Sequence, residues 1–258
     1  MWKQLKECVA FRDFFIQFVR QQLHQRYQSS LLGFLWTLLN PLLLFISFSL
    51  IFSVLNRADL KVYGVYFFSG YMAWTFFSAG VTGAAESIIT NAGYVTRVHV
   101  PNMLFPLAGV AVNLMDLLAS FPILGGIMAV TGAPFSFALA ILPVSVLLLV
   151  VFVCGVGMLF AVSTVFLRDF RHLLASMLFL WFFFSPVLFR LDSLPANSRH
   201  YFEWNPILPF LRMFQAPISQ GVIPDVSDLL KSSLLAAGFL ALGCFAFARS
   251  EKKFYYYL

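Results

Sequence analysis

The stretch from Ser163 to Val187 constrains the fold more than any other part of the sequence. It reads STVFLRDFRHLLASMLFLWFFFSPV, in which a short polar group from Arg168 to His172 separates two apolar runs. A group this rich in charge is too costly to place in hydrocarbon, so it must lie at a water boundary between two helices. The stretch therefore predicts a helical hairpin in a membrane, with an aromatic cluster toward the far end of its second helix.

The composition excludes a soluble domain. Hydrophobic residues make up 60% of the 258 residues, charged residues only 11%, and the mean hydropathy is +0.85. These values lie well outside the range of soluble proteins. The net charge of +6 comes from basic residues near the chain ends and in loops, which indicates membrane topology and argues against a nucleic-acid partner. The three cysteines are far apart and have no metal-binding spacing.

Six apolar segments are long enough to cross a hydrocarbon core of about 30 Å as helices. They are Leu31–Leu55, Val62–Ile89, Asn102–Thr131, Phe137–Phe166, Leu173–Leu191 and Leu229–Ala248. Six spans place both chain ends on one side, and that side holds 11 of the 17 Lys and Arg residues. Both termini are therefore expected in the cytoplasm. We expect an all-α integral membrane protein whose transmembrane domain covers residues 31–258.

Three segments outside these spans have their own character. Residues 1–30 carry the pattern of a basic amphipathic helix, too polar to span, which we expect to lie at the cytoplasmic interface. Residues 192–228 mix five prolines with short apolar pieces, which favours re-entrant or interfacial half-helices between the fifth and sixth spans. Residues 249–258 form a basic, aromatic cytoplasmic tail.

The sequence offers little chemistry for an enzyme. No Ser/His/Asp or Cys/His constellation can be assembled on one membrane face, the histidines are scattered, and no GxxxxGK[ST] motif is present to bind ATP. Of the acidic residues within the spans, Glu86 is interpreted as an interfacial carboxylate. Asp116, one turn after Asn113, is interpreted as a buried hydrogen-bonded contact rather than an ion-coupling group.

Aromatic side chains are the remaining candidates for contact with a substrate. Phe, Tyr and Trp make up 18% of the chain. Their faces suit the apolar C–H faces of sugar rings, and they equally suit lipid and helix packing. The set that we consider as a conduit lining is Trp36, Tyr71, Trp74, Trp181 and Phe184.

The order of several motifs resembles a known family. An amphipathic amino-terminal helix is followed by GFLWTLLNPLLLF, VFLRDFRHLL, WFFFSPVLF, LPANSRHYFEWNPILPFLRMFQAPISQG and a final EKKFYYYL. Together they resemble the permease subunit of ABC transporters that export polysaccharides. The chain looks most like the O-antigen lipopolysaccharide permeases, and less like those for capsule and teichoic acid.

The resemblance implies a half-transporter. Two copies would pair as a homodimer, and two separate nucleotide-binding ATPase subunits would bind ATP and Mg on the cytoplasmic side. A lipid-pyrophosphate-linked glycan would cross the bacterial inner membrane toward the periplasm, with no cofactor, metal or nucleic acid bound by this chain.

The resemblance also carries over site residues. The family's cytoplasmic coupling helix maps onto Gly93 to Pro101, and its periplasmic gate helices map onto Pro195 to Gly221. The coupling residues are Gly93, Tyr94, Arg97 and His99, and the gate residues are Trp204, Pro206, Phe210 and Phe214. Arg168 and Asp169 could bond the coupling region or only cap the following helix.

Other functions stay open at this point. An ABC exporter of a small or lipidic substrate has the same architecture. A membrane glycosyl or acyl transferase would need a catalytic acid or histidine pair, and we find none. An ion-coupled flippase would depend on a proton gradient instead of ATP.

Overall fold

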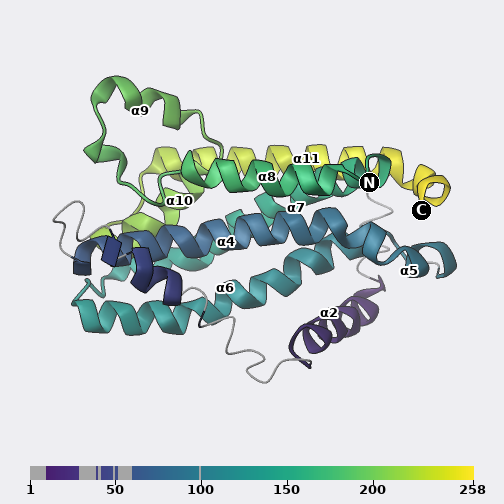
Figure 1. The fold of residues 1–258 in the computed structure, drawn as a ribbon, viewed down its shortest axis with the longest axis horizontal. Helices are drawn as coiled ribbons and strands as arrows, with labels where there is room; N and C mark the ends of the chain where they lie inside the picture. Colours follow the sequence, from purple (N-terminus) through teal and green to yellow (C-terminus); the bar gives the residue numbers. More distant parts are fainter. Residues whose placement is uncertain (1–9, 29–38, 40–41, 49, 52–59, 99) are drawn as a thin grey trace.

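The computed structural model describes residues 10–28, 39, 42–48, 50–51, 60–98 and 100–258, and their regular secondary structure is helical throughout. Long helices lie side by side in an elongated bundle (Figure 1). The short helix α5 (Ala92–Arg97), the turn between α7 (Leu142–Phe166) and α8 (Phe170–Phe183), and the carboxyl terminus lie at one end, which we call the α5 end. Helix α9 (Ala196–Glu203) lies at the other, the α9 end.

Four long helices form the body of the bundle. They are α4 (Leu60–Thr90), α6 (Leu104–Thr131), α7 (Leu142–Phe166), which follows the 3-10 turn η1 (Phe137–Ile141), and α11 (Val226–Tyr257). Among the described residues, three segments are long and apolar enough to cross a membrane: α6, η1 with α7, and α11. Three predicted spans are thereby confirmed. Helix α4 has 31 residues and is long enough to cross a membrane, but it is not apolar enough to be included with these three segments. Most of the predicted span Leu31–Leu55 lies outside the described residues.

The fifth predicted span, Leu173–Leu191, is shorter than expected. Helix α8 covers Phe170–Phe183, only 14 residues or about 21 Å, because Pro186 disfavours helical backbone in the residue before it. The chain then continues as irregular backbone from 184 to 190, in which Ser185 and Val187 are fully buried. The helix of the second arm is therefore too short to cross a membrane alone, and the irregular segment extends the arm beyond it.

Side chains from other helices bind the carbonyl groups of this irregular segment. The Tyr63 hydroxyl donates to the Leu188 carbonyl at 2.7 Å, and the Tyr66 hydroxyl donates to the Pro186 carbonyl at 3.0 Å. The Gln215 amide donates to the same Pro186 carbonyl at 2.9 Å. An unpaired buried carbonyl costs about 1–3 kcal/mol, so these bonds are what allow the helix to break inside the bundle.

The predicted re-entrant region contains two different helices. Helix α9 projects from the bundle, whereas α10 (Leu208–Gln215) is buried over seven of its eight residues and packs against α4, α7 and α11. A 3-10 turn, η2 (Leu191–Ser193), precedes α9, and a π-helical turn, η3 (Ala216–Gln220), follows α10. The one α10 side chain that is not buried, Arg212, pairs with the buried carboxylate of Asp228 at 3.4 Å and ties α10 to α11.

The carboxyl end of the chain differs from the sequence prediction. Helix α11 continues through the predicted tail to Tyr257, because Phe254 is fully buried and packs its ring edge-on against Phe247 at 5.2 Å. The amino-terminal helix is described as α2 (Arg12–Gln28), and its buried Phe18 contacts the rings of Tyr94 on α5 and Phe105 on α6.

Glycines let the long helices approach closely at two crossings. A Cβ added at Gly109 on α6 would lie 2.6 Å from the Gly83 carbonyl oxygen on α4. At the crossing of α7 and α11, a Cβ at Gly155 or Gly243 would collide with backbone of the opposite helix. Close backbone contact of this kind replaces the hydrophobic driving force that is absent between helices in lipid.

We expect Gly109→Ala to lower the thermal unfolding midpoint of the detergent-solubilised protein, because its Cβ would force α6 away from α4. Overpacking of this kind costs about 1–3 kcal/mol. Gly126→Ala in the same helix is the matched control, since a Cβ there meets no described atom within 4 Å. Equal midpoints for both variants would contradict the close crossing.

Candidate functional site

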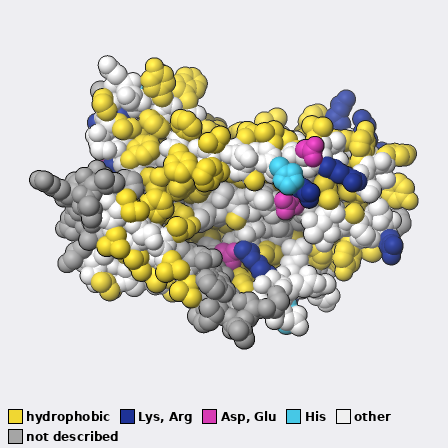
Figure 2. Space-filling view, in the orientation of Figure 1, with side chains coloured by type: hydrophobic (Ala, Val, Ile, Leu, Met, Phe, Trp, Pro, Cys, Tyr) yellow, Lys and Arg dark blue, Asp and Glu magenta, His cyan; other side chains and the backbone are white. Residues whose placement is uncertain are grey.

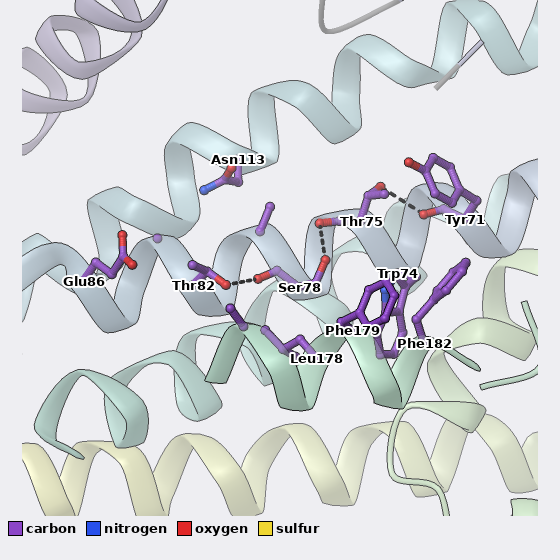
Figure 3. A pocket seen from close by; sticks show the side chains of 13 residues that line it. Tyr71, Trp74, Thr75, Ser78, Thr82, Glu86, Asn113, Leu178, Phe179 and Phe182 are labelled. Atoms are coloured by element: carbon purple, nitrogen blue, oxygen red, sulfur yellow. Dashed lines mark hydrogen bonds between the residues drawn. The ribbon is translucent and has the colours of Figure 1, made fainter. Parts of the chain in front are cut away.

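An open cavity of about 590 Å³ runs along α4, between α6 and α8. We call it the groove. Its length on α4, from Tyr71 to Glu86, corresponds to about 22 Å of helix, most of the thickness of a hydrocarbon core. Figure 3 shows these side chains along one face of α4, with α8 opposite. The lining residues are Tyr71, Trp74, Thr75, Ser78, Ala79, Thr82, Gly83, Glu86, Asn113, Ala175, Leu178, Phe179 and Phe182.

A stripe of hydroxyl groups forms the floor of the groove. Thr75, Ser78 and Thr82 recur at helical spacing and so share one face of α4. Each hydroxyl donates to a carbonyl of its own helix: Thr75 to Tyr71, Ser78 to Thr75 and Thr82 to Ser78, at 2.8–3.2 Å. Because the donors are used within the helix, these oxygens offer lone pairs to the groove. The floor can thus accept hydrogen bonds from a ligand rich in O–H groups.

Aromatic rings close the groove toward the α9 end. Phe182 of α8 lies 5.7 Å from the ring of Trp74 and 6.5 Å from that of Tyr71, centroid to centroid. Behind it, Trp181 meets Trp74 at 6.0 Å and Phe77 at 5.4 Å, edge to face in both pairs. Such aromatic pairs contribute about 0.5–1.5 kcal/mol each beyond burial, so this wall is rigid.

The hydrophobic and the charged side chains gather at different ends of the face shown in Figure 2. Hydrophobic side chains cluster where α8 and α10 approach α9, and most of the visible Lys and Arg lie toward α5 and the carboxyl terminus. The exposed Glu86 ends the groove on the charged side. The groove therefore leads from a charged end of the bundle to an aromatic one.

Asn113 connects the groove to the amino-terminal helix. Its amide nitrogen donates to the Gly109 carbonyl at 2.8 Å, and its side-chain oxygen accepts from Arg26 at 3.3 Å. Arg26 also pairs with Asp116 at 2.9 Å, and the Tyr27 hydroxyl donates to the same carboxylate at 2.8 Å. The interpretation of Asp116 as a hydrogen-bonded contact is confirmed, and its partners come from the end of α2.

The structure describes four of the five aromatic residues proposed as a conduit lining, and they line two different cavities. Tyr71 and Trp74 line the groove. Trp181 and Phe184 line a second cavity beyond its aromatic wall. Trp36 lies outside the described residues.

The residues proposed for coupling lie at the α5 end. Gly93, Tyr94 and Arg97 belong to α5, and His99 lies outside the described residues. In the turn between α7 and α8, Asp169 is the N-cap residue of α8, but its side chain makes no capping hydrogen bond. Arg168 donates to the Tyr257 carbonyl at 3.3 Å, so it contacts the end of α11.

The residues proposed for the gate fall into two groups. Trp204 is 80% exposed at the end of α9, whereas Phe210 and Phe214 are core residues of α10. Phe210 stacks on Phe152 of α7 at 4.5 Å between ring centroids. Pro206 lies between the two helices.

Sequence reasoning missed the hydroxyl stripe, and it missed that Phe179 and Phe182 line the groove. The helical spacing of Thr75, Ser78, Thr82 and Glu86 was available as a signal, but hydroxyl residues are common in transmembrane helices and attract no notice singly. Among the described residues, no group of His, Cys, Asp and Glu is arranged to hold a metal ion.

Comparison with known proteins places the chain among transporters. Residues 14–218 match the family model described as ABC-2 type transporter. The chain is 30% identical over 232 residues to the O-antigen export system permease protein RfbA of Myxococcus xanthus, a match that covers 89% of each chain. It is 25% identical to a protein of the same name from Klebsiella pneumoniae over 82% of each chain. It is 24% identical to the polysialic acid transport protein KpsM of Escherichia coli, over 80% of this chain and 81% of that one.

We expect Asp116→Asn to loosen the attachment of α2, because the Arg26 guanidinium would lose its ionic partner. The loss should amount to about 1–2 kcal/mol in the free energy of unfolding, with faster proteolytic cleavage near residue 28. The control is Asp13→Asn, whose pair with Arg12 is 3.6 Å long and highly exposed, so that its removal changes little. The expectation fails if both variants are cleaved at the wild-type rate.

Proposed function

This chain belongs to the ABC-2 type transporter family, and from that premise we propose that it is the permease of an ATP-driven exporter of a lipid-linked polysaccharide, an O-antigen. Permeases of this family are multi-pass membrane proteins that pair with ATPase subunits. ATP is bound and hydrolysed by the separate subunit, so the permease itself is not an enzyme and has no cofactor site.

The observation that carries the proposal is that the groove combines aromatic faces with hydroxyl groups. A sugar ring has two apolar C–H faces and a rim of hydroxyl groups. The groove offers aromatic faces at Tyr71, Trp74 and Phe182 and hydroxyl acceptors at Thr75, Ser78 and Thr82. A lipidic cargo would have no use for the hydroxyl stripe, which favours a glycan over the small or lipidic alternatives.

The proposed arrangement has six spans, with both termini in the cytoplasm of a bacterium and the permease in the inner membrane. The α5 end would face the ATPase subunits, and the α9 end would face the periplasm. A second copy of the chain would enclose the groove, which is open on one side in the single chain. Two ATPase subunits would complete the assembly, and the glycan would travel from Glu86 toward the aromatic wall.

A capsular polysaccharide is the second candidate cargo. The similarity to the polysialic acid transport protein favours it, at lower identity than the similarity to the O-antigen permeases. A gel of surface polysaccharide distinguishes the two cargoes, because an O-antigen appears as a ladder attached to lipopolysaccharide and a capsule does not.

We expect Ala79→Trp to abolish export, because an indole at this exposed position would fill the groove without disturbing the core. The measurement is a gel of surface polysaccharide from a strain that lacks the gene and carries wild-type or variant copies. Ala237→Trp, at an exposed position of α11 away from the groove, should restore the wild-type ladder. A wild-type ladder from Ala79→Trp would contradict the proposed path.

Reversing both charges of the α7–α8 turn, with Arg168→Asp and Asp169→Arg, should uncouple the motor from the permease. The complex with its ATPase should still hydrolyse ATP, while surface polysaccharide falls strongly, because the turn lies beside the end of α11 at the proposed ATPase face. Lys231→Glu, an exposed charge near the α9 end, is the control and should leave both readouts unchanged. Unchanged export in the reversed variant would show that these two residues do not couple the motor to the permease.

A further inference from the structure

A second cavity, of about 410 Å³, lies beyond the aromatic wall of the groove. We call it the aromatic cup. The end of α8 forms one side and α9 forms the other, and the volume is within the range of small-ligand sites. Its rings and its central amide are Trp181, Phe184, Tyr201, Phe202, Trp204 and Asn205.

Asn205 fixes the geometry of the cup. Its side-chain oxygen accepts from the Trp181 indole at 2.9 Å and from the Ile207 backbone at 3.2 Å. Its amide nitrogen donates to the Phe184 carbonyl at 3.2 Å and to the Ser185 hydroxyl at 3.1 Å. One side chain thus joins the end of α8 to the approach of α10 and holds the indole in one orientation.

Three rings of the cup are largely exposed: Phe184 by 66%, Tyr201 by 79% and Trp204 by 80%. Tyr201 lies on α9 and Trp204 directly follows it, and the other side chains of this helix include Arg199, His200 and Glu203. A helix of this polarity does not belong in hydrocarbon. Arg199 also donates to the carbonyls of Leu194 and Asp192, at 2.9 and 2.7 Å, which joins α9 to the turn before it. The exposed rings are therefore presented by a polar segment.

Trp181 stands between the cup and the groove. On one side its ring contacts Trp74 in the wall of the groove, and on the other side it lines the cup. A polymer leaving the groove past this wall reaches the cup next. The cup is thereby continuous with the proposed path without being part of the groove.

We propose that the aromatic cup is a second saccharide-binding site, which holds sugar rings of the glycan after they leave the groove. The inference rests on the proposed function. Tyr201 and Trp204 present faces for stacking on the C–H faces of a sugar, and the Ser198 hydroxyl at the rim can bond to a sugar hydroxyl. Asn205 is a positioning residue that acts through Trp181. A bound ring in the cup would keep the emerging chain from sliding back into the groove.

The test uses the permease purified with its ATPase partner in lipid nanodiscs. The probe is lipid-free polysaccharide, released by mild acid from the surface of the source bacterium. We expect Trp204→Ala to weaken binding roughly tenfold, which corresponds to the loss of one stacked ring, and Trp204→Phe to recover most of it. Tyr256→Ala is the control, because Tyr256 is 84% exposed at the α5 end of the bundle.

A second pair of variants separates the cup from the groove. With the groove filled by Ala79→Trp, the probe should still bind, and adding Trp204→Ala should remove that binding. Asn205→Leu should weaken binding and also shift the Trp181 fluorescence, since the indole loses its acceptor. Unfolding does not obscure the result, because Trp204 and Tyr256 are both surface residues whose truncation leaves the core intact.

The competing role for the exposed rings is membrane anchoring. Brominated lipids would then quench Trp204 emission, seen as the difference between wild type and Trp204→Phe, and the polysaccharide would not affect it. That result would overturn the proposal that the cup binds saccharide. Equal binding by wild type and Trp204→Ala would overturn it too, and the proposed function would stand as long as the wild-type gene restores surface polysaccharide. Failure of the wild-type gene to restore surface polysaccharide would instead overturn the proposed function.

Discussion

The break in the polypeptide after α8 is the constraint on which the rest of the structure depends. Between residues 184 and 190 the backbone leaves the helix, and residues 185–188 are buried, so the carbonyls freed there need donors. Tyr63, Tyr66 and Gln215 donate to the carbonyls of Pro186 and Leu188. Because two come from the start of α4 and one from α10, satisfying the break also fixes where these two helices pack.

The end of α8 lies between the two cavities, because Phe182 lines the groove and Phe184 lines the cup. The buried helix α10 contributes Phe210 to a run of ring contacts through Phe152 and Phe77 to Trp181. This run joins α10, α7, α4 and α8, so the groove wall rests on the core of the bundle rather than on flexible side chains.

Two acidic residues of the described helices join one element to another. Asp116 holds the end of α2 against α6, and Asp228 holds α10 against α11. A carboxylate that accepts bonds from Arg and Tyr is poorly suited to pick up and release an ion during a transport cycle. This use of the acidic groups fits a permease whose energy comes from a separate ATPase subunit better than it fits ion-coupled transport.

The sequence by itself determined the class of fold, because apolar length and charge placement are local properties that hydrocarbon makes obligatory. It therefore predicted α6, α7, α11 and the hairpin turn at Arg168 and Asp169. The family followed from the resemblance of the ordered motifs in the sequence. Pro186 marked the end of α8, but the sequence did not show that the chain stays buried after it, because that burial depends on distant side chains that bind the freed carbonyls. Likewise, only the tertiary structure decided that Trp74 lines the groove, that Trp181 separates it from the cup, and that Phe210 is core. All three are aromatic residues in apolar surroundings, and what distinguishes them is which neighbouring helix each one faces.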